Sequence, residues 1–192
     1  MARPRQEVEI KFEITDLKAT ARRLRANGFR LRTKRTHETN VLFDLSDASL
    51  RRQGEVLRLR RYGDKWLLTH KGRPTDSRYK RRAEIETEVS DGEALGRIFT
   101  ILGLVESFRY EKFRTAWTDG KGEVVIDETP IGNIGEIEGP PGWIDATAKK
   151  LGVLPADYST KSYAELFFDW KRRTGSQANE MTFHAVSAKR AP

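Results

Sequence analysis

Strict alternation of polar and apolar residues marks the first predicted strand of the chain. From Glu7 to Ile14 every second residue is large and apolar, and the residues between them are Glu, Glu, Lys and Glu. A period of two places the two kinds of side chain on opposite faces of a β-strand. The polar face of this strand therefore consists entirely of ionisable side chains of both signs.

The same alternation recurs and predicts seven further strands, several of them joined by hairpin turns such as Gly63-Asp64 and Asp119-Gly120. On most of these strands two Glu, or two Lys or Arg, stand two residues apart on one face, as Arg58 and Arg60 do. The predicted ranges are 39–44, 55–62, 65–71, 82–89, 108–117, 123–129 and 134–139.

Helical spacing of apolar residues predicts four helices. The first follows a cap at Thr15 or Asp16 and ends at Asn27-Gly28, and the second follows Ser90 or Asp91 and ends at Gly103. The others cover 143–151 and 162–173. In the last helix Tyr163, Leu166, Phe167 and Trp170 form an apolar stripe, which we interpret as core. The segment 45–54 is predicted to be a loop.

Periodicity fades after Gly175. We therefore predict one domain over 1–175 and a mobile basic tail over 176–192, with a short docked segment around Met181 as the alternative. The pattern contains no heptad repeat and makes no prediction of oligomeric state.

Composition narrows the function classes. The 192 residues suit one domain, and the absence of cysteine excludes disulfides, thiolate metal sites and cysteine nucleophiles. No apolar leader or long apolar run supports secretion or membrane insertion, so we expect a cytoplasmic protein. The formal net charge of +8 favours an anionic partner such as phosphate esters, nucleic acid or polyphosphate, although solvation of a charged surface also explains it.

The charged strand faces have two interpretations. Each face by itself is typical of the solvated side of an antiparallel sheet. Taken together, the repeated pairs of like charge indicate an α+β fold with a closed eight-stranded antiparallel β-barrel, whose charged interior forms a tunnel and whose helices pack on the outside. Because unpaired buried ions cost several kcal/mol each, such an interior must hold water, metal and anion.

The two kinds of charge suit different ligands. Clusters of Arg and Lys bind polyvalent oxyanions, since guanidinium offers a planar fork to phosphate oxygens. Clusters of Glu suit Mg²⁺ or Mn²⁺, which complete their coordination with water and phosphate oxygens. The combination predicts a metal-bridged polyphosphate.

A series of motifs then gives the chain a family resemblance. In order they are Glu7-x-Glu9-x-Lys11, Leu57-Arg58-Leu59-Arg60, Thr69-His70-Lys71-Gly72, Arg82-x-Glu84-x-Glu86, Glu111-Lys112-x-Arg114, Asp127-Glu128, Gly135-Glu136-Ile137-Glu138 and Lys161-Ser162-Tyr163. From Glu7 to about Trp170 the chain resembles the CYTH, or triphosphate tunnel metalloenzyme, family. That family includes class IV adenylyl cyclases, thiamine triphosphatases and inorganic triphosphatases. The resemblance implies a tunnel that binds a small-molecule triphosphate with Mg²⁺ or Mn²⁺.

The resemblance also implies roles for individual residues. Metal ligands would be Glu7, Glu9, Glu136 and Glu138, while Glu84, Glu86 and Asp127 could ligate metal or orient basic residues. Triphosphate-binding residues would be Lys11, Arg58, Arg60, Lys71, Arg82, Lys112, Arg114 and Lys161, with Lys11 also catalytic. For Lys161, helix capping is the alternative to a phosphate contact.

The function implied is cleavage of a triphosphate, and two reactions stay open. Attack by water gives hydrolysis, whereas attack by the ribose 3′ hydroxyl of ATP on the α-phosphorus gives cyclic AMP and pyrophosphate. The alternative from another class is a non-enzymatic barrel that binds polyphosphate or RNA. Against RNA, the charged faces carry no aromatic platform of the kind that stacks bases.

Overall fold

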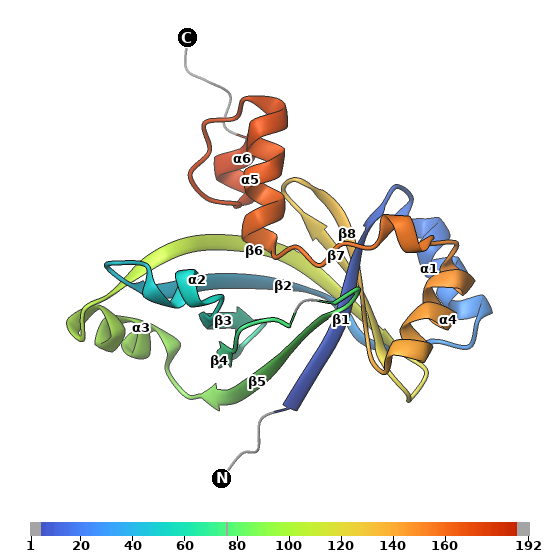
Figure 1. The fold of residues 1–192 in the computed structure, drawn as a ribbon, viewed down its shortest axis with the longest axis horizontal. Helices are drawn as coiled ribbons and strands as arrows, with labels where there is room; N and C mark the ends of the chain where they lie inside the picture. The colour runs from blue at the N-terminus through green and yellow to red at the C-terminus, as the bar shows by residue number, and fades with distance from the viewer. Residues whose placement is uncertain (1–4, 76, 188–192) are drawn as a thin grey trace.

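The computed structural model describes residues 5–75 and 77–187, and its central element is a closed antiparallel β-barrel. Around the ring the strands follow the order β1-β5-β4-β3-β2-β6-β7-β8 (Figure 1). The strands are β1 (Arg5–Ile14), β2 (Arg30–Leu45), β3 (Val56–Tyr62), β4 (Lys65–Lys71), β5 (Lys80–Val89), β6 (Leu104–Thr118), β7 (Glu123–Thr129) and β8 (Gly132–Glu138). The predicted fold class is thereby confirmed.

Strands β2 and β6 are longer than the sequence pattern predicts. They contain 16 and 15 residues and pair with each other over almost their whole length. The first part of β2, from Arg30 to Glu38, is rich in basic and polar residues and lacks alternation. Register shifts between Leu31 and Thr33 and between Thr33 and Thr36 disturb the period of two there. Pairing with β6 makes this segment a strand despite its weak local signal.

Side chains of capping residues fix the starts of three helices. The Asp16 carboxylate accepts from the Ala19 amide at 2.9 Å before α1 (Leu17–Ala26), and Asp91 does the same before α3 (Gly92–Ile101). Ser162 and Glu165 form a capping box at the start of α5 (Tyr163–Thr174). The remaining helices are α2 (Ser49–Gln53), α4 (Pro141–Leu151), the 3-10 helix η1 (Pro155–Asp157) and α6 (Phe183–Ser187).

Helix α2 lies in the segment predicted as a loop. The helix is capped from outside its own segment, because the Asp44 carboxylate at the end of β2 accepts hydrogen bonds from the amides of Leu50 and Arg51. An acceptor on the preceding strand thus caps a helix too short to be stable by itself.

The apolar core lies outside the barrel, between the strands and the helices. Ile10 and Phe12 of β1 pack in one cluster with Leu24 of α1 and Ile144 of α4. Gly135 opposes Phe12 in the β1-β8 pair, and a Cβ at this glycine would lie 2.2 Å from the Phe12 ring. A second cluster joins β6 to α5. The charged faces of the strands are therefore left to face the interior of the ring.

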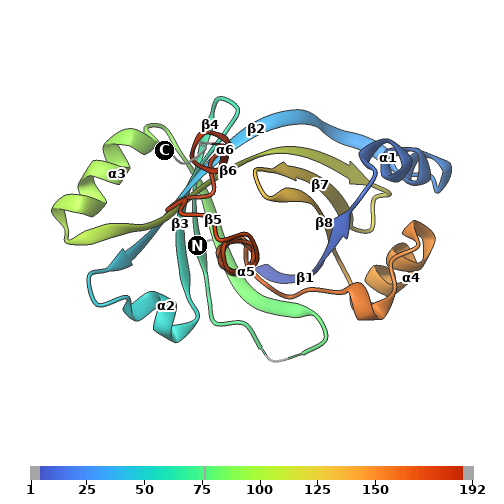
Figure 2. The ribbon, with the colours of Figure 1, turned by 90° about the horizontal axis from the view of Figure 1, so that it is seen from above.

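The C-terminal segment docks on the barrel as far as it is described. Met181 is fully buried, and its backbone bonds to Arg109 and Glu111 of β6. This arrangement of 176–187 corresponds to the docked alternative rather than to the mobile tail, while 188–192 of the predicted tail lie outside the described residues. Helix α5 stands over one end of the barrel and is seen end-on in Figure 2.

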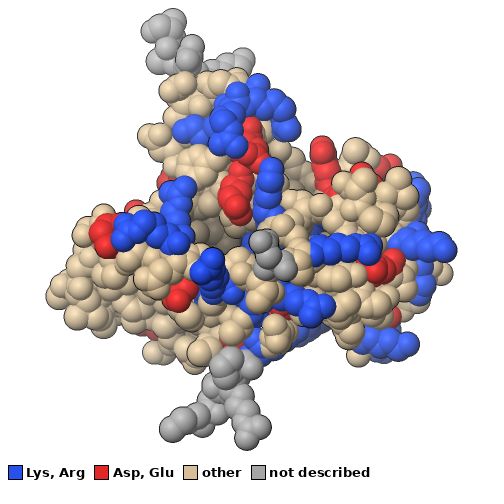
Figure 3. Space-filling model, viewed as in Figure 1, with Lys and Arg blue, Asp and Glu red and all other residues tan. Residues whose placement is uncertain are grey.

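The outer surface is also basic. On the face shown in Figure 3, Lys and Arg side chains are spread over the barrel region and α5. The positive charge is therefore not confined to the interior, and net charge alone does not locate a site. Within the part of the chain that is described, no helix combines the length and apolar character needed to cross a membrane.

Candidate active site

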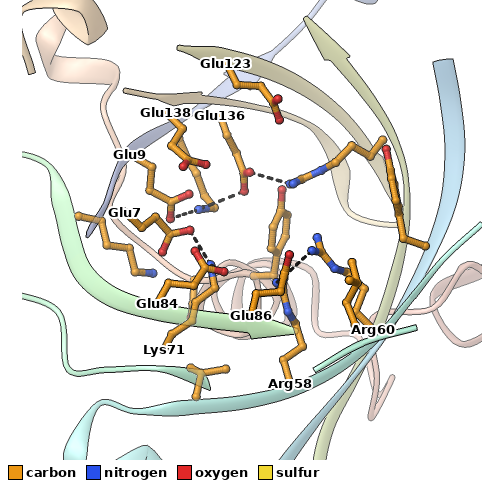
Figure 4. Close-up of a pocket in the computed structure, with 18 of the residues that line it drawn as sticks. Glu7, Glu9, Arg58, Arg60, Lys71, Glu84, Glu86, Glu123, Glu136 and Glu138 are labelled. Carbon is orange, nitrogen blue, oxygen red and sulfur yellow. Dashed lines mark hydrogen bonds and ion pairs between the residues drawn. The ribbon is translucent and has the colours of Figure 1, made fainter. Parts of the chain in front are cut away.

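Charged side chains from all eight strands surround a cavity of about 310 Å³ inside the barrel, with further polar contributions from the start of α5 (Figure 4). Its ten basic and seven acidic lining residues leave an excess of three positive charges. They are Arg5, Lys11, Arg32, Arg58, Arg60, Lys71, Lys80, Arg82, Lys112 and Arg114, with Glu7, Glu9, Glu84, Glu86, Glu123, Glu136 and Glu138. All predicted site residues except Asp127 and Lys161 line this cavity.

The acidic cluster lies where β1 meets β8. Strand register sets Glu9 opposite Glu138 and Lys11 opposite Glu136. In Figure 4 Glu7, Glu9, Glu136 and Glu138 lie on one side of the cavity. Burial raises the pKa of Glu138 to about 7, and the neighbouring Glu7, Glu9 and Glu136 act in the same direction, while Arg5 only partly opposes them. Glu138 is therefore only weakly neutralised by its basic neighbour.

Lys11 bridges two members of the cluster. Its Nζ lies 2.6 Å from Glu9 and 3.1 Å from Glu136. Burial by itself lowers the pKa of this ammonium, but Glu136 and Glu9 outweigh burial and hold the pKa above its ordinary value. Lys11 therefore stays protonated, which suits it to stabilise phosphate charge and not to accept a proton.

Glu7 is already neutralised by basic neighbours. Its carboxylate accepts from Lys71 Nζ and, at 2.9 Å, from Arg82 Nε. Although burial acts in the opposite direction, Lys71 and Arg82 lower the pKa of Glu7 to about 2. Lys71 also lies 3.4 Å from Glu84. Two cations and two carboxylates thus form one ion-pair network on this wall.

On the opposite wall, two arginines have N–H donors without a hydrogen-bond acceptor. Arg60 bonds to Glu86 at 2.7 Å and Arg58 bonds to Thr69 at 3.2 Å. The buried Nε–H groups of both arginines have no acceptor among the described residues. Burial and the charge of Arg58 lower the pKa of Arg60. An anion in the cavity would supply the missing acceptors and relieve the repulsion.

Asp127 and Glu38 lie behind the lining as buried counter-ions. Asp127 accepts from Lys112 at 2.9 Å, from Arg114 at 2.8 and 2.6 Å, and from the Tyr163 hydroxyl. These contacts occupy the Asp127 carboxylate with basic and hydroxyl donors, the arrangement expected if its role is to orient basic side chains. Glu38 is fully buried 3.6 Å from Lys112 and was not among the predicted site residues. Glu38 lies two residues before Asn40, so extending the alternating pattern of this strand toward the N-terminus places it on the same face.

Tyr163 has a second role besides the predicted one in the core, and Lys161 lies away from the predicted phosphate site. Tyr163 belongs to the apolar stripe of α5 and stacks on Tyr110, with 5.4 Å between ring centroids. Its hydroxyl nevertheless donates to Asp127, and Lys112 Nζ lies 4.2 Å from its ring centroid. The residue is therefore part of the charged site as well as of the core. Lys161 lies outside the tunnel lining and pairs with Asp169 at 2.6 Å on the surface of α5.

The acidic cluster suits a hard divalent cation in chemistry and in charge. Among the described residues, no three acidic or histidine side chains are gathered closely enough to form a complete metal site on their own. Mg²⁺ and Mn²⁺ commonly take only one or two protein carboxylates when phosphate and water oxygens complete the coordination. Burial is the main cause of the raised pKa of Glu138, with a further contribution from the neighbouring carboxylates, and a cation bound beside Glu138 would stabilise its ionised form. The donor set therefore fits a metal that binds together with a phosphate ligand.

Comparisons with known proteins give consistent matches. The family model of the CYTH domain matches residues 5–163. A protein of Methanocaldococcus jannaschii named "Putative adenylate cyclase MJ0240" is 30% identical over 171 residues, covering 83% of this chain and 97% of that protein.

Solved structures share the fold. A "putative adenylate cyclase" of Vibrio parahaemolyticus has a TM-score of 0.75 at 18% identity, covering 84% of this chain and 97% of that chain. A protein of Hippeastrum, described as a candidate adenylyl cyclase with a dominant triphosphatase activity, has a TM-score of 0.62 at 21% identity. That match covers 85% of this chain and 95% of the Hippeastrum chain.

Proposed function

Because the chain belongs to the CYTH domain family, we propose that it is a divalent-metal-dependent enzyme that binds a triphosphate in the barrel tunnel and cleaves it. One observation carries the proposal. The cavity sets arginines with unused buried donors opposite an acidic cluster whose charge is only partly neutralised. A polyvalent oxyanion and a divalent cation, bound together, satisfy both walls.

In this proposal the basic wall binds and orients the triphosphate. Arg58, Arg60 and Arg114 donate to non-bridging oxygens, and Lys11 and Lys112 contribute point charges. Phosphoryl transfer needs little covalent participation by the protein, so positioning and charge stabilisation supply the catalysis. Asp127 and Glu38 keep the basic side chains in place from behind.

Glu7, Glu9, Glu136 and Glu138 are the residues we propose for the metal. A bound Mg²⁺ or Mn²⁺ would neutralise phosphate charge and favour departure of the leaving oxygen. Glu138 is the member least neutralised by the protein, since its partner Arg5 is largely solvent-exposed. Lys11 lies between Glu9 and Glu136 and holds both in position.

Two reactions fit the same tunnel. In hydrolysis water attacks a phosphorus and a P–O bond of the phosphoanhydride breaks; the name of the Hippeastrum protein supports this reaction. In cyclisation the 3′ hydroxyl of ATP attacks the α-phosphorus and pyrophosphate leaves; the name of the Methanocaldococcus jannaschii relative supports that one. We propose triphosphate cleavage as the common function, with these as its two forms.

A parallel product assay tests the proposal. The full chain is incubated with ATP, inorganic triphosphate or thiamine triphosphate, in Mg²⁺ or Mn²⁺, and orthophosphate, pyrophosphate and cyclic AMP are measured. Arg60→Ala should raise the KM for the preferred substrate by about 10-fold or more, since a hydrogen bond to a charged group contributes about 1.5 to 3 kcal/mol.

Arg61→Ala is the matched control, because Arg61 is the next residue of β3 and is exposed. It should leave KM unchanged. Salt-sensitive binding of polyphosphate or RNA without any product would instead support the non-enzymatic barrel and contradict the proposal.

A further inference from the structure

Lys80 is a buried basic residue of the tunnel that the sequence motifs do not include. It begins β5 and lies opposite Glu9 in the β1-β5 pair, so its side chain lies on the charged side of the ring. Only 6% of the residue is exposed, and it lines the cavity together with Ser162, Tyr163 and Ala164 of the α5 end. The side chain is therefore largely buried near the end of the tunnel over which α5 stands.

The surroundings of Lys80 differ from those of the other basic residues in the cavity. Each of the nine others has a carboxylate oxygen within 4.0 Å. Lys80 has neither a carboxylate within that distance nor a hydrogen-bond acceptor among the described residues. The charged groups that face it are Lys11 and Glu9 on β1, Arg82 on β5 and Glu165 on α5.

The balance of these charges is unfavourable to the ammonium form. Burial is the main cause that lowers the pKa of Lys80 to about 7, and the charges of Lys11 and Arg82, which together outweigh those of Glu9 and Glu165, contribute to the same shift. A buried ammonium without a partner destabilises a fold, and an apolar side chain of similar length would fill the same space. The charge of Lys80 thus does not stabilise the fold when the tunnel is empty.

We propose that Lys80 is a further triphosphate-binding residue, which contacts the phosphate group lying nearest the α5 end of the tunnel. The inference rests on the proposed function and adds to it a residue that the family motifs quoted above leave out. An anion beside Lys80 would provide the missing partner for its ammonium and would offset the repulsion from Lys11 and Arg82. Binding of the anion would therefore stabilise the charged form of Lys80, which is unfavourable in the empty tunnel.

Two measurements on the full chain test this role. Isothermal titration calorimetry gives the Kd of inorganic triphosphate for wild type, Lys80→Met, Lys80→Arg and Lys65→Met, and thermal unfolding without anion gives the stability of each. Lys65 is the control, because it is exposed on β4 and pairs with Glu88 outside the tunnel.

Lys80→Met should raise the Kd by about 10-fold or more, as expected for loss of a contact to a charged group. Lys80→Arg should keep most of the affinity, and Lys65→Met should change nothing. Without anion, Lys80→Met should unfold at the same temperature as wild type or higher. The two effects have opposite signs, which a merely structural lysine would not produce.

Three results would overturn the inference. They are an unchanged Kd in Lys80→Met, a lower unfolding temperature of Lys80→Met without anion, and failure of both Lys80 variants to fold. Failure of wild type to bind inorganic triphosphate would overturn the proposed function instead, and the two failures are distinguished by the wild-type titration alone.

Discussion

Glu138→Gln should stabilise the empty protein while it removes activity. In the folded chain burial and the carboxylates of Glu7, Glu9 and Glu136 hold the pKa of Glu138 at about 7, above the ordinary 4.5. A carboxyl group whose pKa is raised by folding contributes full stability below the unfolded pKa and loses that contribution as pH rises through the folded pKa. At 1.36 kcal/mol per pH unit, and with 27% of the side chain exposed, the loss is about 2 to 3 kcal/mol above pH 7.

The assay is thermal unfolding with chelator and without phosphate, at pH 5 and pH 8. Glutamine removes the charge at similar volume, so Glu138→Gln should raise Tm at pH 8 by roughly 4 to 12 °C, at about 2 to 4 °C per kcal/mol for a chain of this size. At pH 5 wild-type Glu138 is already protonated, and the two proteins should unfold at similar temperatures. Glu93→Gln, on the exposed start of α3, is the control and should shift Tm little at either pH.

The same variant should turn over triphosphate far more slowly than wild type, because a proposed metal ligand is lost. A fall in Tm at pH 8, or an equal gain at both pH values, would refute the electrostatic reasoning. Higher stability with unchanged turnover would leave the electrostatics standing and remove Glu138 from the proposed metal site.

Three other outcomes follow from the site and its supports. Exhaustive chelation should abolish turnover and added Mg²⁺ or Mn²⁺ should restore it, so activity that persists in chelator would contradict metal dependence. Tyr163→Phe removes one donor to Asp127 and should lower the free energy of unfolding by about 1 kcal/mol, measured by urea denaturation; no change would show that the hydroxyl contributes nothing. Met181→Ala should cost about 2 to 5 kcal/mol in the same assay if the docked segment supports β6, whereas a mobile tail would show no effect.

The sequence was sufficient for the fold because the decisive signal is local. Alternation in 7–14, 55–62 and 65–71 places charges on one face and apolar residues on the other. The repetition of pairs of like charge on most strands indicates a shared charged interior, which the closed ring provides. The same signal fails at the starts of β2 and β5. At Tyr79-Lys80-Arg81-Arg82 consecutive basic residues interrupt the alternation, so Lys80 fell outside the predicted strand.

Residues with two roles were harder to predict. The apolar stripe of α5 correctly indicated that Tyr163 is buried, but a stripe reports apolar area and not the partner of a hydroxyl. That partner, Asp127, lies 36 residues earlier in the chain. Likewise Lys161 occurs in a motif that resembles the family, yet its side chain extends along the outside of α5 to Asp169. The sequence alone does not determine which residues at the start of a helix face the tunnel.

Closure of the barrel joins the first strand of the chain to the last. β1 bonds to β5 on one side and to β8 on the other, so the strand synthesised first is completed by the strand synthesised last. Pairings between distant segments form slowly because the intervening chain must be ordered. During synthesis one edge of β1 therefore stays unpaired until β8 has left the ribosome. The acidic corner formed by these two strands is assembled only at that late step. A fragment that ends before Gly132 has an open sheet with two exposed edges, which makes it prone to aggregate and unable to form the acidic corner.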